Sequence, residues 1–470
     1  MKSEIERIVA NVKSGRTSAR AEVERALAQA KERDELHCLL GVCAEQALAR
    51  ADRLDVRLKK GESVGRLAGV PYVAKDNFLT KVGHTTAASK MLDNFRSPID
   101  ATAIERIEAE DAIMIGKANL DAFAHGGSTE NSAFGPTHNA IDKGRVAGGS
   151  SGGSAVAVAS GIVPFALGSD TGGSIRQPAS FNGVVGYKPT YGMISRYGVV
   201  AMASSTDTVG PITRTVRDSE IIADILAGQD QRDGTVYPRY FSQIAESPSG
   251  QRIGLIEDFI GEGVDDDVAS RTNQLAQRLR ESGHRVDLVK LPMARYALAI
   301  YYIVIPAELS SNMARYDGIR YGERSPEAHR LDDVYGMSRD DGLMPENKRR
   351  IMIGSYVLSS GYYDAYYLKA QQARTLLIRQ LDKLFESYDF LLSPVSPTPA
   401  FKLGENTHDP LKMYLADAMT VPASLAGLPA ISVPNGRSKA GLPIGVQLIA
   451  PAKADAGLLA MAKQLEADDA

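Results

Sequence analysis

The 470-residue chain contains no tryptophan and only two cysteines, Cys38 and Cys43. Two cysteines cannot form the disulfide framework of a small secreted protein, so we expect both to be inert, reduced thiols. Long apolar runs are also missing, since none approaches the ~20 residues that a membrane-spanning helix requires. The amino terminus, MKSEIERIVANVKSGR, lacks the apolar segment of a secretory signal. These absences predict a soluble, cytoplasmic protein.

Positive charge is not in excess either, because the formal net charge is −3. Proteins that neutralise nucleic-acid phosphates on their own are usually strongly basic, so we expect any nucleic acid to be held mainly by a partner. The seven histidines include no pair with the spacing of a zinc finger or of an H-E-x-x-H helix. The sequence therefore predicts no metal site in this chain.

The composition that is present, 44% hydrophobic and 24% charged residues, is that of an ordinary globular protein. We expect a single α/β domain over residues 1–470, in which residues 1–60 form a helical lead-in. Residues 154–160 and 268–282 are predicted to be helical, and residues 228–250 to be a surface connection. Short apolar runs predict buried strands. These runs are residues 70–74, 112–116, 163–167, 253–256, 285–289, 390–392, 430–433 and 444–449.

The run GSDTGGSIRQP, residues 168–178, is the most informative segment of the chain. Ser174 directly follows Gly172 and Gly173, and glycines allow a sharp turn because they carry no Cβ. Such a turn can direct consecutive backbone N–H groups at one substrate oxygen, as an oxyanion hole requires. A serine in this position is typical of the nucleophile in acyl transfer.

A second run, GGSSGGSA at residues 148–155, supplies Ser150. On its own, such a run is more typical of a flexible linker or a helix N-cap. It also fits the G-x-S-x-G nucleophile elbow, but residues 145–147 make a poor preceding strand. A phosphate-binding loop is disfavoured because the G-K-[S/T] ending is absent.

Together with Lys75 in the segment GVPYVAKDN, the two runs resemble the amidase signature family. Ser150 lies 24 residues and Lys75 lies 99 residues before Ser174, as in that family. The resemblance extends from about Gly69 to the last predicted helix. It implies an α/β/α sandwich with a large mixed β-sheet covered by helices, and a catalytic unit of serine, cis-serine and lysine.

The resemblance implies that Ser174 is the nucleophile and that its proton passes through Ser150 to Lys75. Lys75 can accept a proton only when it is neutral, so burial must lower its pKa by more than the adjacent Asp76 raises it. We therefore expect Lys75 to be buried and Asp76 to point elsewhere. The resemblance also implies a cis peptide bond between Gly149 and Ser150.

The oxyanion hole implied by the resemblance consists of the N–H groups of Thr171, Gly172 and Gly173, together with that of Ser174. The Thr171 hydroxyl is assigned by the resemblance to the substrate amide, but a turn hydrogen bond explains it equally well. Arg176 is expected to anchor this loop and not to contact substrate.

Several segments are similar to one branch of the family, the glutamine-hydrolysing A subunits of tRNA-dependent amidotransferases. They are SSTDTVGPITRTVRD, RYDGIRYG, KRRIMIGSYVLSSGYYDAYY, DPLKMYLADAMTVPASLAGLPAISVP and LPIGVQLI. The resemblance implies that this chain releases ammonia from glutamine and binds no cofactor itself. It also implies two partners, the amidotransferase B and C subunits. The first would hold misacylated Glu-tRNA(Gln) or Asp-tRNA(Asn) and use ATP and Mg²⁺, and the second would stabilise the complex.

Glutamine carries both charges at its backbone end, so a selective pocket needs a cation for the carboxylate and an anion for the ammonium group. Arg350 and Asp417 lie in segments that match the branch, and Tyr301 is a weaker third candidate for substrate contact. From the residues alone, a solvated basic helix face is the favoured interpretation of Arg350, and Asp417 could be a surface carboxylate.

Two other functions are compatible with the same residues. A free-standing hydrolase of another small amide would keep the relay without the pocket of Arg350 and Asp417, and a scaffold protein would keep only the fold. The sequence also departs from the family pattern at Ala147, His125 and Asn182, where proline, an apolar residue and cysteine are usual. Four tyrosines with helical spacing are expected to pack in the core: Tyr362, Tyr363, Tyr366 and Tyr367.

Overall fold

The computed structural model describes residues 3–242 and 248–467. Its centre is one eleven-stranded mixed sheet with the strand order β1-β3-β2-β4-β6-β5-β10-β11-β9-β7-β8. The strands are β1 (Leu39–Val42), β2 (Pro71–Lys75), β3 (Ile113–Ala118), β4 (Phe165–Asp170), β5 (Val185–Lys188), β6 (Thr208–Thr213), β7 (Arg252–Ile256), β8 (Arg285–Val289), β9 (Phe390–Pro394), β10 (Ala430–Arg437) and β11 (Pro443–Ile449). All eight predicted strands are confirmed.

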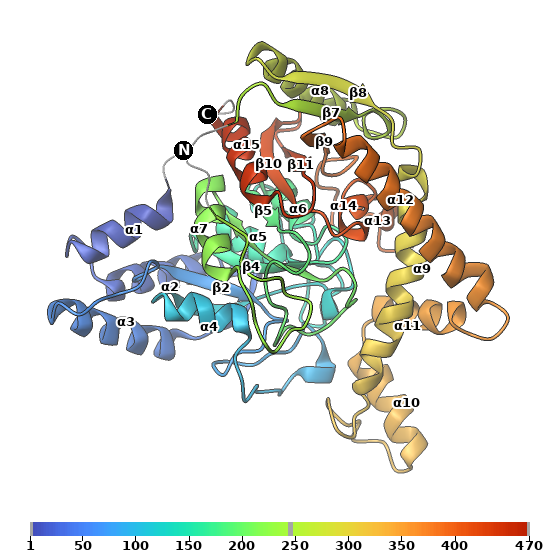
Figure 1. Cartoon of the computed structure of the whole chain (residues 1–470). Coiled ribbons are helices and arrows are strands. Elements are labelled where there is room, and N and C mark those ends of the chain that lie inside the picture. The colour runs from blue at the N-terminus through green and yellow to red at the C-terminus, as the bar shows by residue number, and fades with distance from the viewer. Residues whose placement is uncertain (1–2, 243–247, 468–470) are drawn as a thin grey trace.

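Helices cover both faces of the sheet (Figure 1). Successive side chains of a strand point to opposite faces, and every residue of the central strands β2, β3 and β4 is buried, so both faces must be covered. Figure 1 shows the helices arranged around the strands. They are α1 (Glu4–Lys13), α2 (Ala19–Glu32), α3 (Ala44–Lys59), α4 (Thr102–Ala109), α5 (Gly152–Ala159), α6 (Arg176–Asn182), α7 (Val216–Leu226), α8 (Asp266–Glu281), α9 (Ala294–Asn312), α10 (Leu331–Gly342), α11 (Pro345–Val357), α12 (Lys369–Phe385), α13 (Pro410–Leu415), α14 (Val421–Leu425) and α15 (Asp455–Ala467). The α/β/α arrangement agrees with the expectation.

The first sixty residues are mostly helical, with α1, α2 and α3 separated by short connections. They also contain strand β1, which the sequence did not predict and which pairs antiparallel with β3. The strand is only four residues long, and half of its residues are exposed at the edge of the sheet, which makes it difficult to recognise. The lead-in is therefore joined to the sheet by backbone hydrogen bonds as well as by helix packing.

Strands β7 and β8 are parallel and connected by α8, as the sequence predicted. The unit extends one end of the sheet through pairing of β7 with β9. In the predicted surface connection before it, residues 228–242 and 248–250 form no helix or strand. Residues 243–247 lie outside the described part of the chain.

Strands β2 and β4 place the functional segments side by side. They are parallel neighbours, with Ala74 of β2 paired to Leu167 of β4. Lys75 is the last residue of β2, and Asp170 is the last residue of β4 before the run that contains Ser174. Because the carboxyl ends of parallel strands meet at the same edge of a sheet, residues that are distant in sequence come together there.

One helix, α9 with the turn that follows it, is long and apolar enough to cross a membrane by length and composition alone. The expectation that no apolar segment approaches the length of a membrane-spanning helix is therefore wrong for residues 294–315. Half of the apolar window is buried within the protein, where α9 packs against α11, α12 and α14. Burial in a protein core explains the apolar character of this helix.

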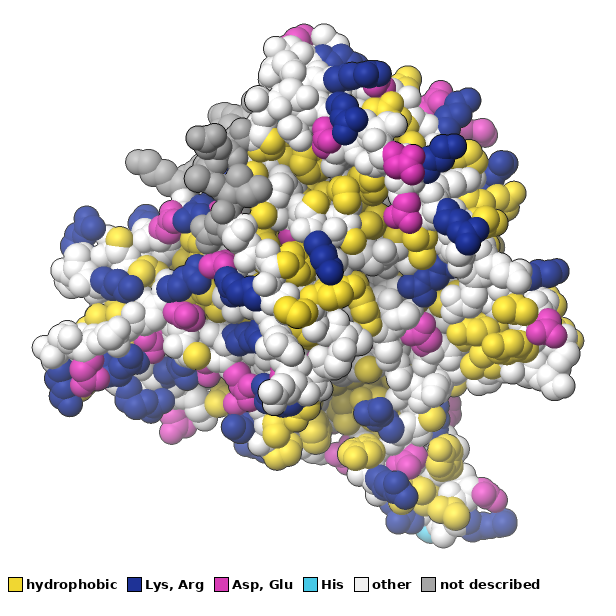
Figure 2. Space-filling model, viewed as in Figure 1, with side chains coloured by type: hydrophobic (Ala, Val, Ile, Leu, Met, Phe, Trp, Pro, Cys, Tyr) yellow, Lys and Arg dark blue, Asp and Glu magenta, His cyan; other side chains and the backbone are white. Residues whose placement is uncertain are grey.

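The prediction that the tyrosine cluster packs in the core is wrong. Tyr362, Tyr363 and Tyr366 are each more than 40% exposed, in and beside a short π-helical segment (Tyr363–Leu368) between α11 and α12. Tyr362 and Tyr366 contact each other and Tyr356 instead, with ring centroids 4.3 Å apart for Tyr356 and Tyr362. Figure 2 shows hydrophobic side chains gathered on this part of the surface, at the right of the view. The spacing of these tyrosines predicts that their rings lie on one side of a helix, but it does not predict whether that side faces the core or the solvent.

Candidate functional site

Lys75 is fully buried, and its amine lies within hydrogen-bond distance of two serine hydroxyls. Lys75 Nζ is 2.8 Å from Ser150 Oγ and 3.0 Å from Ser169 Oγ. Burial lowers the pKa of Lys75 to about 7, although the charges of Asp121, Asp170 and Asp207 act in the opposite direction. A substantial fraction of this amine is therefore neutral at physiological pH and able to accept a proton.

Asp76 points away from Lys75, as expected. Its carboxylate pairs with Lys117, whose Nζ lies 3.0 Å from Asp76 Oδ1, and it accepts hydrogen bonds from the backbone and hydroxyl of Thr86. The nearest carboxylate in sequence is thus neutralised by a different lysine. This arrangement lets burial determine the pKa of Lys75.

Ser150 follows a cis peptide bond at Gly149, in agreement with the prediction. Ser150 is fully buried, and helix α5 begins two residues later. Gly149 is required by close packing, because a Cβ atom there would lie 2.7 Å from the backbone nitrogen of Ser128. The turn that carries Ser150 therefore packs directly against the 121–131 loop.

Ser174 lies at the other side of the same turn, where its carbonyl accepts a hydrogen bond from the N–H of Ser151. Its side chain is slightly exposed, and the hydroxyl makes no hydrogen bond within the described residues. The N–H groups of residues 171–174 likewise have no acceptor in the described part of the chain, whereas the N–H of Ile175 binds Asp170. Four consecutive N–H donors next to a free hydroxyl are therefore available to form an oxyanion hole.

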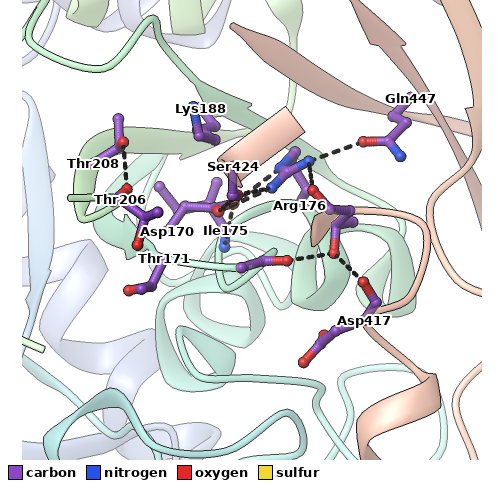
Figure 3. A network of polar contacts seen from close by, with 12 residues as sticks. Asp170, Thr171, Ile175, Arg176, Lys188, Thr206, Thr208, Asp417, Ser424 and Gln447 are labelled. Atoms are coloured by element: carbon purple, nitrogen blue, oxygen red, sulfur yellow. Dashed lines mark hydrogen bonds and ion pairs between the residues drawn. The ribbon is translucent and has the colours of Figure 1, made fainter. Parts of the chain in front are cut away.

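Arg176 anchors this loop through the contacts of its guanidinium group, as predicted (Figure 3). Its guanidinium makes two hydrogen bonds of 3.0 Å to Asp170 and further bonds to Ser424 Oγ, the Thr420 carbonyl and Gln447 Oε1. All of these contacts are buried. Burial alone would raise the pKa of Asp170, but the charge and hydrogen bonds of Arg176 outweigh it and the net pKa is lowered.

We predict that Arg176→Met lowers the free energy of unfolding by about 3–5 kcal/mol, because it leaves Asp170 buried without its counter-charge. Urea unfolding followed by circular dichroism measures this change. Arg252→Met is the matched control: Arg252 pairs with Asp389 at the surface, where such a pair contributes less than about 1 kcal/mol. Equal effects of the two substitutions would contradict the prediction.

Two further contacts hold the loop on its other sides. The Thr171 hydroxyl donates to Asp207 Oδ1 over 2.7 Å, so this hydroxyl is engaged by the protein. The Thr420 hydroxyl lies 2.6 Å from the Gly172 carbonyl and 3.0 Å from the Asp417 carbonyl. Thr420 therefore links the loop directly to Asp417, whose carboxylate points away from this network in Figure 3.

A cavity of about 260 Å³ lies beside the turn and contains both predicted charged residues, Arg350 and Asp417. Gly127 and Ser128 form another wall, and these are the residues against which the Gly149 turn packs. The cavity is therefore adjacent to the turn that carries Ser150. Its remaining lining residues include Asp121, Glu130, Asn131, Tyr302, Met344, Glu346, Arg349, Met413 and Tyr414.

Arg350 is not part of an exposed basic helix face. It is 4% exposed, and its Nε lies 2.8 Å from Glu346 Oε1. The guanidinium carbon lies 5.1 Å from the ring centre of Tyr302 and 5.6 Å from that of Tyr414, and these two rings stack on each other. Cation–π contacts and the ion pair orient the guanidinium in the cavity wall.

Asp417 is partly exposed, but one oxygen of its carboxyl group is buried and unused. Its Oδ1 atom has no hydrogen-bond partner among the described residues, and burial raises the pKa of the carboxyl group to about 8. A Cβ atom on Gly127 would lie 3.4 Å from Asp417 Oδ2, so the missing side chain at Gly127 leaves room beside this carboxyl group. A positively charged ligand group would bind here and favour the ionised form.

Tyr301 does not line this cavity, but it contacts Tyr302, which does. The side chain is 4% exposed, and a Cβ atom on Gly172 would lie 2.7 Å from its hydroxyl oxygen. Its ring contacts that of Tyr302 edge-on, at a centroid distance of 5.1 Å. Tyr301 thus lies between the loop of residues 171–174 and the stacked rings of Tyr302 and Tyr414.

Sequence reasoning missed the aromatic residues Tyr302 and Tyr414, the glycine at position 127 and the carboxylate of Glu346. Tyr302 and Tyr414 are distant in sequence, and each resembles an ordinary packing residue in its own helix. For Glu346, the spacing of four residues to Arg350 is a usable signal of an ion pair on one helix face. No cluster of three or more potential metal ligands occurs within the described residues.

The chain matches known proteins along most of its length. A family model described as Amidase matches residues 21–459. The chain is 49% identical over 436 residues to the A subunit of glutamyl-tRNA(Gln) amidotransferase from Koribacter versatilis (strain Ellin345), a match that covers 92% of this chain and 91% of that protein. The protein of the same name from Geobacillus thermodenitrificans (strain NG80-2) is 51% identical over 420 residues, with coverage of 88% and 86%.

Solved structures agree with these matches. The crystal structure of the glutamyl-tRNA(Gln) amidotransferase A subunit from Thermotoga maritima has a TM-score of 0.79 and 41% identity, covering 94% of this chain and 90% of that one. Native peptide amidase from Stenotrophomonas maltophilia has a TM-score of 0.82 and 26% identity, covering 99% and 97%. With the serine and lysine geometry described above, these matches establish that the chain belongs to the amidase signature family.

Proposed function

We propose that this protein hydrolyses the side-chain amide of glutamine as the A subunit of a tRNA-dependent amidotransferase. The observation that carries the proposal is the cavity in which buried Arg350 and the unpaired carboxyl group of Asp417 lie beside the turn of Ser150. A cation and an anion in one cavity suit the α-carboxylate and α-ammonium groups of an amino acid. The relatives of about 50% identity that bear this name support the same substrate.

In the first half of the reaction, Ser174 Oγ attacks the amide carbon of glutamine while its proton passes to Ser150, which in turn protonates Lys75. The N–H groups of residues 171–174 stabilise the oxyanion that forms. Ser150 then protonates the leaving nitrogen and recovers a proton from Lys75. The C–N bond breaks, ammonia leaves, and a glutamyl ester remains on Ser174.

In the second half, water attacks the ester and gives its proton to the same relay. The C–O bond to Ser174 breaks, Ser174 is reprotonated, and glutamate is released. No group in this cycle needs a metal or an organic cofactor. Arg350 and Asp417 hold the end of glutamine that does not react, and Tyr301 supports the loop of residues 171–174 from the cavity side.

The ammonia would serve a second reaction on partner proteins in the cytoplasm. We propose that the B subunit holds misacylated Glu-tRNA(Gln) or Asp-tRNA(Asn) and activates its carboxylate with ATP and Mg²⁺, and that the C subunit stabilises the assembly. The net charge of −3 favours a partner as the main holder of tRNA. Co-purification of the three proteins and a glutaminase assay with and without charged tRNA test this part.

We predict that Asp417→Asn raises KM for glutamine at least about 30-fold, because the α-ammonium group loses a charged partner worth several kcal/mol when buried. Steady-state glutaminase assays measure it. In the native protein KM should also fall as pH rises through about 8, where Asp417 ionises, and this dependence should disappear in the variant. Asp266→Asn, at an exposed position on α8, is the matched control.

The same assay separates the competing activity. A free-standing hydrolase of another small amide would lose little on Asp417→Asn and would hydrolyse amides that lack the α-ammonium and α-carboxylate groups. Unchanged KM and kcat for glutamine in the variant would therefore remove the basis of the glutamine proposal. Reaction of Ser174 with a fluorophosphonate would still report whether the relay is active.

A further inference from the structure

His125 is a buried side chain that the reaction does not use. It is fully buried at the end of the turn that follows β3, and the next two residues, Gly126 and Gly127, line the cavity. Its Nδ1 lies 2.6 Å from the side-chain nitrogen of Asn347, in the first turn of α11. This contact joins two cavity walls that are more than 200 residues apart in sequence.

The direction of this hydrogen bond is determined by the other contacts of Asn347. The amide oxygen of Asn347 accepts from the N–H of Met344, and the amide nitrogen donates to the carbonyl of Ala122 over 2.8 Å. The amide nitrogen is therefore the donor toward His125, and His125 Nδ1 must be the acceptor. The imidazole is consequently neutral, with its proton on Nε2.

The surroundings of His125 keep it neutral. Burial, and next the positive charge of Arg350, lower the pKa of His125 well below its ordinary value. Its Nε2 atom is buried and has no hydrogen-bond partner in the described part of the chain, which is a cost that an apolar side chain would avoid. What histidine contributes at this position is therefore the Nδ1 acceptor.

Asn347 transmits this contact to the cation of the cavity. It lies one helical turn before Arg350 on the same face of α11, and Glu346, the ion-pair partner of Arg350, is its neighbour in the chain. On the other side, the His125 carbonyl accepts from Asn131, another cavity residue. The imidazole thus connects the loop beside Asp417 to the helix that carries Arg350.

We propose that His125 is a positioning residue for substrate binding, which sets the separation of the Arg350 and Asp417 walls by accepting a hydrogen bond from Asn347. The proposal rests on the proposed function, because it concerns the charged end of an amino-acid substrate. His125 acts on binding and not on the relay, because the two hydrogen-bond networks share no residue. Lys75 binds Ser150 and Ser169, whereas the side-chain nitrogen of Asn347 binds His125 and Ala122.

The test compares His125→Leu with His125→Gln in the full chain, co-purified with its partner proteins. The leucine variant should raise KM for glutamine about three- to tenfold, the range expected for one lost hydrogen bond, and change kcat less than about twofold. The glutamine variant keeps a side-chain acceptor and should recover most of the native KM. In the double variant His125→Leu/Asn347→Leu, KM should exceed that of Asn347→Leu alone by less than about twofold, because the shared contact is already lost.

Two controls separate the possible failures. Thermal unfolding and the rate of fluorophosphonate labelling of Ser174, which needs no charged end group, should match the native protein if only positioning is lost. An unchanged KM in His125→Leu, or equal losses in kcat, labelling and thermal stability, would overturn the positioning role. If native protein labels at Ser174 but hydrolyses no glutamine, the proposed function itself fails and this inference falls with it.

Discussion

Lys75→Met is expected to abolish glutamine hydrolysis, with less than about 1% of native kcat remaining, because the relay then has no group to accept the proton of Ser174. Methionine keeps the length of the side chain and fills the same buried space. A glutaminase assay with a sensitive ammonia readout measures the loss. A variant that keeps a tenth of native activity would exclude Lys75 as the base.

The pH dependence of the native protein follows from the same residue. Burial lowers the pKa of Lys75 to about 7, so the neutral, active amine becomes predominant as pH rises through 7. We expect kcat/KM to rise with pH across this value. A pH–rate profile that falls or stays flat between pH 6 and about 8 would contradict a lysine base.

The same substitution is expected to stabilise the fold. Below pH 7 Lys75 is protonated in both states, and the buried charge destabilises the folded protein in full. Between pH 7 and the ordinary lysine pKa of about 10.4, the unfolded chain binds the extra proton, so native stability rises with pH across this window. Lys75→Met removes this cost and the share of the pH dependence that Lys75 contributes, and should therefore raise the midpoint of thermal unfolding at pH 7.

Lys188 offers a matched control for these experiments. It is equally buried, and burial also lowers its pKa to about 7, but its amine donates to the backbone carbonyls of Pro189 and Leu428 and not to a serine hydroxyl. Lys188→Met should keep at least about half of native activity. Loss of activity in both variants would show that the loss is not specific to the lysine beside Ser150.

Gly173→Ala is expected to lower kcat about 100- to 1000-fold, the effect of losing one oxyanion donor. Gly173 has a φ of +146°, a conformation that disfavours residues with a Cβ. A Cβ atom there would lie 2.2 Å from Thr420 Oγ1, the group that binds the Gly172 carbonyl. The alanine must therefore displace either Thr420 or the loop whose N–H groups we propose as the oxyanion hole.

The matched control is Gly457→Ala in α15, where a Cβ atom meets nothing within 4 Å. Alanine in a helix should stabilise the protein by about 0.5–1 kcal/mol without a change in kcat. Measuring kcat by glutaminase assay and stability by urea unfolding for both variants separates damage to the loop from loss of the fold. A Gly173→Ala protein with kcat within about threefold of native would show that the loop tolerates the change.

The serine and lysine residues could be recognised from the sequence because their chemistry imposes local patterns. Ser174 needs glycines before it, Ser150 needs a glycine turn, and Lys75 must end a buried strand, so each leaves a short motif. The strands could be recognised because both faces of the sheet are covered and their apolar runs are nearly continuous.

The cavity could be predicted only in part. Arg350 and Asp417 stood out through the resemblance to related proteins, since neither has a local motif. The stacking of Tyr302 on Tyr414 and the space left by Gly127 depend on contacts between segments that are distant in the chain. Spacing along a helix cannot report such contacts, and for the same reason it misplaced the exposed tyrosines around Tyr362.

The sequence by itself determined the groups that we propose to react, because the proposed nucleophile, its relay and the glycine loop are encoded in short segments, two of them at the ends of β2 and β4. Only the tertiary structure decided what those groups meet: Asp76 turned toward Lys117, Arg350 placed beside stacked rings, and His125 joined to Asn347. The physical reason is that burial and electrostatic environment depend on packing between distant segments, and these determine whether a lysine is neutral and whether an arginine faces a cavity.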